Sequence, residues 1–412
     1  MKFLEQLKQE IIPEERTDNE VNKVIEAINS RLRKLKIKAL CIKGGSIAKG
    51  TFLKGDYDVD LFVRFDYSYS EEDLSKLLEK ALKGLKAEKV HGSRDYFQIK
   101  EKELVYEIVP VLDVKNYKKI KNITDMSLLH VNFVEKSIKK NKKLADEIRL
   151  AKYFCKAQRI YGAESYIKGF SGYVVELLII NYGSFGKFIK AAAKWKDRQI
   201  IDIKKQVKDP MFELNKAKTE GPLILIDPVQ PNRNAAAALS KENYDKLKEI
   251  AKNFIKNPTT EFFKKKKIDV DKLKQKNKNN ELVLLKVKSK RGKEDVVGGK
   301  LLKAFAFMAH EINKNEFAVL ESGWEWNRKE EALFYFAVKK EKLSEFKKHR
   351  GPPLKNRDNV LAFTRKYKKT FEENGRVFAD IKRKYTDFGK LVNDLTKSKY
   401  LLEKIREIKL LK

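Results

Sequence analysis

Two aspartates one residue apart, Asp58 and Asp60 in the run YDVDLFVRF, are the side chains whose spacing most clearly indicates chemistry. Alternate side chains of a β-strand share a face, so the two carboxylates would lie roughly 6.6 Å apart, which is twice the rise per residue. Adjacent carboxylates repel each other, and divalent cations between them relieve that repulsion. Because paired metals promote in-line attack on a phosphate, the spacing indicates a metal-dependent phosphate site. A strand face that merely carries exposed charges is the alternative.

A glycine turn lies shortly before the aspartates. Gly44, Gly45 and Ser46 follow the apolar run ALCIK, and Lys49 adds a positive charge to the same turn. Bare backbone amides and a hydroxyl at the start of a helix can bind a triphosphate. The Walker spacing GxxxxGK[ST] is absent, so the signal is the combination of this turn with the D-x-D strand.

A third acidic ligand is expected on a neighbouring strand. The run LVYEIVP offers Glu107, with Tyr106 and Ile108 on the opposite face, while Glu103 and Asp113 share the parity of Glu107. We favour Glu107, because an unpaired carboxylate among apolar residues in mid-strand is costly unless a metal or another cation meets it.

Short apolar runs and helical spacing predict the elements that position these residues. The runs at 38–43, 57–65 and 104–112 predict strands, and 71–84 has helical spacing. Helical spacing over 4–35 predicts a segment that covers one face of the sheet. Together they predict a small α/β domain.

The rest of the chain divides into a helical region and a mixed one. Helical spacing continues from 125 to about 188, and 223–240 predicts a strand or extended loop leading into a helix that begins at NAAAAL. A charge-dense connection precedes a separate α+β unit, in which helices are expected from the segment after GPPL to Lys412. We therefore predict three domains, at 1–140, 141–258 and 259–412.

The net charge indicates the class of partner. The chain has 92 Lys and Arg against 58 Asp and Glu, a formal charge of +34, which predicts a large polyanion as partner. A Lys-rich composition that serves solubility or heat tolerance is the alternative. No long uncharged apolar run and no signal-peptide h-region is present, so we expect a cytoplasmic protein without a membrane partner. Cys41 and Cys155 stand among apolar residues and are expected to be reduced core residues.

The string GGSIAKGTFLKGDYDVDLFVRF resembles the active-site signature of the nucleotidyltransferase superfamily. Three later strings are similar to the archaeal-type, class I CCA-adding enzymes of that superfamily. They are LAKYFCKAQRIYGAESYIKGFSGYVVELLIINYGSF at 150–185, IDPVQPNRNAAAALS at 226–240 and GPPL at 351–354. The resemblance implies an α+β multidomain fold with a polymerase-beta-like nucleotidyltransferase head, a helical neck that binds the nucleotide base, and a basic RNA-binding body and tail.

The resemblance also implies roles for individual residues of this chain. Metal binding is implied for Asp58, Asp60 and Glu107, triphosphate contact for Ser46 and Lys49, contact with the phosphates and ribose for His130, Lys152 and Tyr161, and reading of the base for Arg233, with Asn234 beside it. The family commonly has Asp where this chain has Glu107, which is one methylene longer. Taken singly, these residues also fit a capped histidine, a solvated lysine, a half-buried aromatic and an arginine bound to an acidic neighbour.

By the same resemblance, the protein adds C, C and A to the 3′ end of tRNA from CTP and ATP, without a template and with Mg²⁺. Cytosine and adenine both present an amino donor beside a ring-nitrogen acceptor, so one pocket can accept both and reject uracil and guanine. The implied partners are the acceptor arm of tRNA, the two nucleotides and a second copy in a homodimer. The alternatives are a poly(A) polymerase or oligoadenylate synthase, and a non-catalytic RNA-binding relative, in which loss of D-x-D is expected.

The charge and the resemblance together predict strongly salt-dependent binding to the acceptor arm. Each neutralised phosphate contributes a slope of about −0.7 to −0.9 in the logarithm of the binding constant against that of salt concentration, and several contacts add. Competition between a tRNA acceptor arm and an unstructured RNA of equal length measures whether shape is read. Equal affinity for the two RNAs would mean that the charge provides only general adhesion to polyanions.

Overall fold

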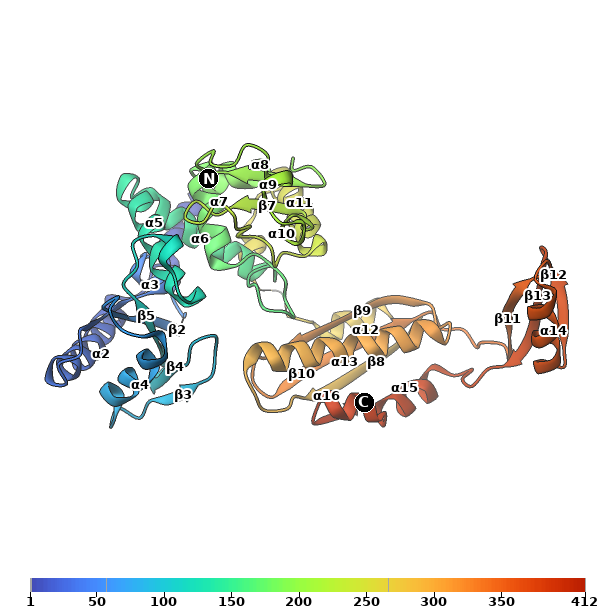
Figure 1. Cartoon of the computed structure of the whole chain (residues 1–412). Helices are drawn as coiled ribbons and strands as arrows, with labels where there is room; N and C mark the ends of the chain where they lie inside the picture. Colours follow the sequence, from blue (N-terminus) through green and yellow to red (C-terminus); the bar gives the residue numbers. More distant parts are fainter. Residues whose placement is uncertain (1, 57, 266, 412) are drawn as a thin grey trace. The chain divides into compact units, whose positions relative to one another are not determined.

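The computed structural model describes residues 2–56, 58–265 and 267–411, which belong to two compact units, Met1–Lys266 and Lys267–Lys412. Figure 1 labels most of the helices and strands of each unit. Within these described residues, no helix combines the length and apolar character needed to cross a membrane.

The first unit begins with a five-stranded sheet in the order β1-β2-β5-β4-β3. Its strands are β1 (Ala39–Lys43), β2 (Asp58–Phe65), β3 (Glu88–Val90), β4 (Tyr96–Glu101) and β5 (Leu104–Leu112). Only β2 and β5 pair in parallel, whereas the other pairs are antiparallel. Parallel neighbours need a crossover, which α4 (Glu71–Leu82) and the β3–β4 pair provide.

Two helices cover one face of this sheet. Ile28 of α2 (Glu15–Lys34) and Leu78 of α4 share a core with Val59, Leu61 and Tyr106 of the central strands. The prediction that the whole segment 4–35 covers the sheet is wrong for its first part. There α1 (Lys2–Glu10) packs against α6 (Lys143–Ala157), a helix of the domain that follows. The break near Pro13 separates the two helices, so each buries its own apolar stripe.

The opposite face carries α3 (Gly45–Ala48) and α5 (Met126–Lys140). Two short 3₁₀ turns, Tyr117–Lys119 and Ile123–Asp125, lead into α5. Asp125 is fully buried, accepts a hydrogen bond from the Leu112 amide at 2.9 Å and pairs with the guanidinium of Arg94. These contacts attach the start of α5 to the end of β5.

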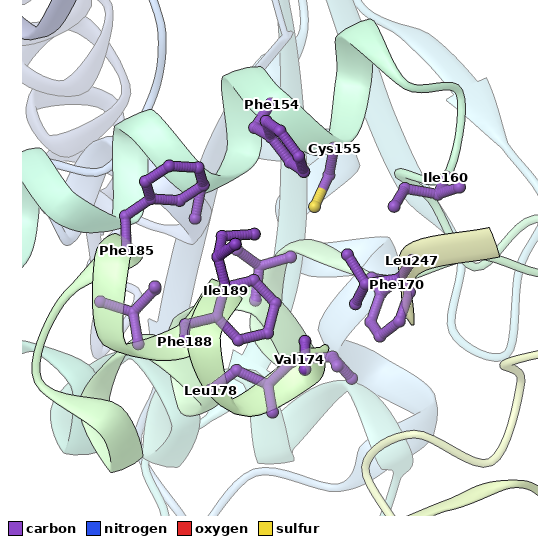
Figure 2. Packing of buried hydrophobic residues seen from close by; sticks show 14 of the residues in the cluster. Phe154, Cys155, Ile160, Phe170, Val174, Leu178, Phe185, Phe188, Ile189 and Leu247 are labelled. Carbon is purple, nitrogen blue, oxygen red and sulfur yellow. The ribbon is translucent and has the colours of Figure 1, made fainter. Parts of the chain in front are cut away.

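The second domain is mainly helical. Its helices are α6 (Lys143–Ala157), α7 (Gly172–Tyr182), α8 (Phe185–Ala192), α9 (Pro210–Glu213), α10 (Lys216–Thr219) and α11 (Lys241–Lys256), with a 3₁₀ turn at Thr260–Phe263. Two parallel strands, β6 (Gln199–Asp202) and β7 (Leu223–Ile226), complete it. Figure 2 shows the core, in which Phe154 and Cys155 of α6 lie among Phe185, Phe188 and Leu247. Both cysteines are free and buried, as predicted.

The helix expected to begin at NAAAAL begins later, at Lys241. The reason is Asn234, whose side-chain oxygen accepts hydrogen bonds from the Leu225 and Ala236 amides while its amide nitrogen donates to the Leu223 carbonyl. An asparagine that bonds to the backbone in this way competes with helix formation, so the alanines that follow form turns.

The second unit contains two antiparallel sheets. The first, in the order β14-β8-β10-β9, consists of β8 (Glu281–Lys288), β9 (Val319–Trp326), β10 (Glu331–Val338) and β14 (Glu407–Leu410). Residues of α13 (Glu294–Lys314), α15 (Phe388–Thr396) and α16 (Lys399–Lys404) share its core. The second, in the order β11-β13-β12, consists of β11 (Phe346–Pro353), β12 (Thr370–Glu373) and β13 (Arg376–Lys382). The remaining helices are α12 (Val270–Lys276) and α14 (Arg357–Lys366).

The expectation of helices through to Lys412 is wrong, because three strands lie in this stretch. Asn374 and Gly375 join β12 to β13 with φ values of 46° and 72°. Asn-Gly between apolar and charged alternating residues is a strong hairpin signal, since both residues tolerate positive φ. The strand β14 pairs with β8, which precedes it by more than a hundred residues in the chain.

Candidate active site

The acidic residues predicted as metal ligands lie on the face of the sheet opposite α2 and α4. Asp58 is exposed at the start of β2 and Asp60 is half-buried, whereas Val59 and Leu61 between and beside them are buried. In the parallel register, Asp60 lies opposite Glu107 of β5. Gln98 of β4 lies opposite Glu107 on its other side and donates a hydrogen bond to Glu107 Oε1 at 2.8 Å.

The glycine turn packs directly on Asp60. The Gly44 amide donates to the Asp60 carbonyl at 2.8 Å, and Gly45 has a φ of +47°. A Cβ at Gly45 would lie 1.7 Å from Asp60 Oδ2, so only glycine fits this position. The turn therefore brings the amide groups at the start of α3, and Ser46 with them, next to the carboxylates.

Crowding of the carboxylates changes the proton affinity of the central one. Burial, and then the nearby charges of Glu107 and Asp58, raise the pKa of Asp60 to about 6, although Lys49 and Lys152 act in the opposite direction. Carboxylate oxygens are the ligands that Mg²⁺ prefers, so this donor set fits such an ion chemically. Across the described part of the chain, no three His, Cys, Asp or Glu side chains are close enough together to form a metal-binding group. Asp60 and Glu107 lie side by side on the neighbouring strands β2 and β5.

Two lysines implied in phosphate binding meet at one carboxylate. Lys49, which ends α3, and Lys152, from α6, each donate to Glu176 of α7 at 2.7 Å. Thr51 Oγ1 donates to the same carboxylate at 2.8 Å. Burial opposes the charged form of Glu176, but the two lysines outweigh it and hold the pKa of Glu176 at about 2.

Tyr161 lies beside these lysines. Burial raises the pKa of its hydroxyl, and the charges of Glu176 and Asp56 add to the effect. A Cβ at Gly172, the first residue of α7, would lie 2.7 Å from the Tyr161 hydroxyl and 3.8 Å from Lys152 Cε. A glycine at this position therefore leaves room for both side chains.

Three side chains converge on Asp227, which follows β7. His130 Nε2 lies 3.0 Å from Asp227 Oδ2, Tyr173 donates to Oδ1 at 3.1 Å, and Arg233 Nη1 donates to Oδ2 at 2.6 Å. The rings of His130 and Tyr173 stack with centroids 4.1 Å apart. Burial opposes ionisation of Asp227, but the hydrogen bond and charge of His130, the Val229 amide and the charge of Arg233 lower its pKa to about 2.

The structure separates the roles of Arg233 and its neighbour. The Arg233 side chain binds Asp227 and is still 34 % exposed. Asn234 is 3 % exposed, and its side chain bonds to the backbone around β7. Asn234 therefore shapes the loop that carries Arg233.

Three residues of this region are missed by the sequence reasoning. They are Glu176, Tyr173 and Asp227. Glu176 does leave a signal, because it is the one acidic residue in the apolar run GYVVELLIINY of a buried helix. A carboxylate in such a run needs cationic or hydrogen-bonding partners. Asp227 leaves a similar signal at the end of the fully buried strand LILI.

A separate cavity of about 620 Å³ lies alongside α5. Phe133 and Lys136 of α5, Arg64 of β2 and Lys204 are among the residues that line it. Its lining includes none of the residues predicted as metal or nucleotide ligands, so this cavity is distinct from the site described above.

Three family models match the chain in succession. The nucleotidyltransferase domain matches residues 21–153, the second domain of tRNA nucleotidyltransferase matches 146–264, and the C-terminal domain of the CCA-adding enzyme matches 278–407. The predicted fold class is thereby confirmed: a polymerase-beta-like head is followed by a helical second domain and a β-rich C-terminal domain.

Curated relatives extend over most of the chain. The CCA-adding enzyme of Nanoarchaeum equitans is 34 % identical over 366 residues, which is 87 % of this chain and 88 % of the relative. That of Methanocaldococcus jannaschii is 32 % identical over 85 % of this chain and 79 % of the relative. That of Thermococcus gammatolerans is 30 % identical over 95 % and 87 %, respectively.

Among solved structures, the Cid1 poly(U) polymerase with magnesium and 3′-dATP is similar with a TM-score of 0.52 and 14 % identity, covering 64 % of this chain and 98 % of that one. At this identity the similarity concerns the fold alone. The match does not cover the whole chain, and it carries no information about which nucleotide is used here.

The raised pKa of Asp60 predicts a pH-dependent cost to stability. Folding raises this pKa from 3.8 to about 6, so the folded chain binds the proton more tightly and the contribution of Asp60 to stability falls as pH rises through this interval. We compare the change in the free energy of unfolding that Asp60→Asn causes at two pH values, with a chelator present. This change should be more stabilising near pH 8 than near pH 4, by about 1–3 kcal/mol. Urea unfolding at the two pH values measures the difference.

The matched control is Asp58→Asn, at the exposed carboxylate two residues away. It should change the free energy of unfolding less, because water screens an exposed charge. An Asp60→Asn effect that is the same at both pH values would contradict a raised pKa of Asp60 in the folded chain.

Proposed function

The chain belongs to the archaeal-type CCA-adding enzymes, which add CCA to the 3′ end of tRNA, and we propose that Asp58, Asp60 and Glu107 form its reaction centre. The observation that carries this proposal is the position of Asp60, which lies beside Glu107 on the neighbouring strand and packs against the Gly45 backbone. Repelling carboxylates beside a glycine turn are an arrangement suited to metal-bound phosphate.

The related polymerase activities are less well supported. The curated relatives that cover most of this chain at 30 % identity or more are CCA-adding enzymes. The likeness to the poly(U) polymerase is one of fold alone. A non-catalytic relative is disfavoured because Asp58 and Asp60 are both present.

Enzymes of the nucleotidyltransferase superfamily typically use a divalent metal. We assign Mg²⁺ as that metal and Asp58, Asp60 and Glu107 as its ligands. When bound, the metal supplies charge stabilisation to the attacking 3′-oxygen and to the α-phosphate. The reaction joins the 3′-oxygen to the α-phosphorus and releases pyrophosphate. Gln98, on the β4 side of Glu107, donates to Oε1 and thereby fixes the position of this carboxylate, which is one methylene longer than that of aspartate.

The triphosphate is assigned to the groups next to these carboxylates. Ser46 and the amides of the glycine turn offer neutral donors, while Lys49 and Lys152 offer positive charge. Tyr161 reaches the same place from the loop before α7 and can donate its hydroxyl to a phosphate or to the ribose. His130, which is hydrogen-bonded to Asp227, is assigned to the ribose.

The base is assigned to Arg233. Asp227 accepts from Nη1, which fixes the plane of the guanidinium and leaves its other donors for a ligand. A donor at a fixed position suits the unprotonated ring nitrogen of cytosine or adenine. It opposes uracil and guanine, whose corresponding ring nitrogen carries a hydrogen. The alternative interpretation, in which Arg233 binds an acidic neighbour, is compatible with base reading. One guanidinium can bind Asp227 and a base at the same time.

The remaining expectations stay proposals. We assign the acceptor arm of tRNA to the region 259–412, as RNA-binding body and tail, with CTP and ATP bound between the domains 1–140 and 141–258. A-form RNA is recognised mostly by shape and backbone contacts, which suits an enzyme that must accept every tRNA. A homodimer and a cytoplasmic location remain predictions, and sedimentation at several protein concentrations measures the first.

Removing either aspartate should abolish addition of both nucleotides. Asp58→Ala and Asp60→Ala each delete a metal ligand common to every step, so transfer to a tRNA lacking its last three nucleotides should be lost while tRNA affinity persists. Labelled CTP and ATP measure the transfer. Asp113→Ala removes an aspartate just beyond the same strand as Glu107 and serves as the control, with activity retained. Glu107→Asp should also remain active. If Asp60→Ala turned over at nearly the rate of the unchanged chain, the assignment of these carboxylates as the reaction centre would be wrong.

Arg233→Ala should impair nucleotide choice more than RNA binding. Loss of one well-placed contact to a base lowers discrimination by about 1–3 kcal/mol. The ratio of kcat/KM for CTP and ATP over UTP and GTP measures this, with exposed Arg198→Ala in the same domain as the control. A variant with an unchanged ratio would show that Arg233 does not read the base.

A further inference from the structure

We infer that Glu176 is a positioning residue for the nucleotide triphosphate: its single carboxylate holds Lys49 and Lys152 together as cations before the nucleotide arrives. This inference rests on the proposed assignment of the two lysines to the triphosphate. Glu176 belongs to the second domain, and its own negative charge would repel a phosphate.

The geometry around Glu176 is specific for this role. The carboxylate is fully buried, and its two oxygens are divided between the lysines, with Oε2 accepting from Lys49 and Oε1 from Lys152, each at 2.7 Å. Thr51 Oγ1 also donates to Oε1 at 2.8 Å and accepts from Lys152 Nζ at 3.0 Å. The lysine side chains are only 9 % and 3 % exposed. Both ammonium groups are therefore fixed in space by the same anion.

The lysines need this anion because they are buried together. Burial is the largest effect on Lys152 and lowers its pKa, and the charge of Lys49 lowers it further. Glu176 opposes this through charge and a hydrogen bond, and Asp56 opposes it more weakly, but the pKa of Lys152 stays below its usual value because burial is the largest effect. Tyr161 is close but neutral at ordinary pH, since burial raises its pKa. Both lysines also act on Asp60, the carboxylate assigned to the metal.

The three elements that meet here come from different parts of the first unit. Lys49 and Thr51 follow the glycine turn, Lys152 belongs to α6 and Glu176 to α7. One carboxylate and two ammonium groups leave a net charge of +1 at the place assigned to the triphosphate. Glu176 therefore holds both lysine Nζ atoms in place before the nucleotide arrives, so that less ordering accompanies its binding. Without the carboxylate, Lys152 would lose its proton readily and triphosphate binding would require proton uptake.

Glu176→Gln tests the inference, because glutamine keeps the size and removes the charge. At about pH 9 we expect KM for CTP and ATP to rise about 10- to 100-fold, in line with the loss of a hydrogen bond to a charged group. KM should fall again toward the normal value near pH 7, as Lys152 regains its proton. This interval lies above the pH range in which Asp60 titrates. Affinity for tRNA should stay unchanged, and Glu176→Asp should show a flatter pH profile than Glu176→Gln.

Glu147→Gln is the matched control. Glu147 of α6 also forms a mostly buried ion pair, with Lys8 at 2.6 Å, and accepts from the Phe185 amide at 2.7 Å, but it contacts none of the assigned nucleotide ligands. This variant should lower thermal stability while the pH profile of KM stays that of the unchanged chain. A pH profile for Glu176→Gln that matches this control would overturn the inference and leave Glu176 a structural residue.

Two further variants separate failure of the inference from failure of the proposed function. Lys49→Met and Lys152→Met should each raise KM for CTP; if neither does, the triphosphate assignment itself is wrong. If both do while Glu176→Gln keeps the profile of the unchanged chain, only the role of Glu176 is wrong.

Calorimetry of the unchanged chain decides the question even if Glu176→Gln does not fold. CTP with Mg²⁺, in the absence of tRNA, is titrated near pH 8 in two buffers of different ionisation enthalpy. The inference predicts no net proton uptake, because the lysines are charged beforehand. Uptake of about one proton per CTP would overturn it.

Discussion

The repulsion between Asp60 and Glu107 is the constraint on which the first unit of this protein depends. Parallel pairing of β2 with β5 places the two residues opposite each other on one face of the sheet. Burial and the neighbouring carboxylates raise the pKa of Asp60 to about 6, so the ionised pair is unfavourable without a cation. The surroundings leave room for these carboxylates. The helices α2 and α4 cover the opposite face of the sheet, and Gly45 has no Cβ that would clash with Asp60. The catalytic centre that we propose thus carries a cost to stability, which a bound cation would relieve.

Two other buried carboxylates act in the opposite sense. Glu176 and Asp227 are surrounded by donors and cations, which hold the pKa of each near 2 despite burial. Each belongs to the second domain and binds a side chain of the first, Lys49 in one case and His130 in the other. The two domains of this unit are therefore joined by charged hydrogen bonds at the place that we assign to the nucleotide. Such contacts favour one arrangement of groups over many, which an apolar contact would not do.

Repeated addition of two nucleotides at one centre fits the division of tasks that we propose. In that proposal the carboxylates of β2 and β5 and the lysines at Glu176 contact atoms common to CTP and ATP. The Arg233 guanidinium, which is hydrogen-bonded to Asp227, is the group assigned to the base. The chain as a whole carries a formal charge of +34, and this general attraction for RNA is independent of the base that is being added.

The sequence by itself determined the local features of this protein. Alternation in β2 placed Asp58 and Asp60 on one face, and the apolar surroundings of Glu107 singled it out. Strings along the chain indicated the family. Each of these features depends on residues that are close together in sequence. Local spacing also misled where a single side chain intervened, as with Asn234 before α11, and it missed the Asn374–Gly375 hairpin. Only the tertiary structure decided which residues meet: Lys49 reaches Glu176 across 127 positions, and His130 reaches Asp227 across 97. No periodicity encodes such pairs, since the partners lie on separate elements whose packing brings buried charges together, and burial is what makes their pairing obligatory.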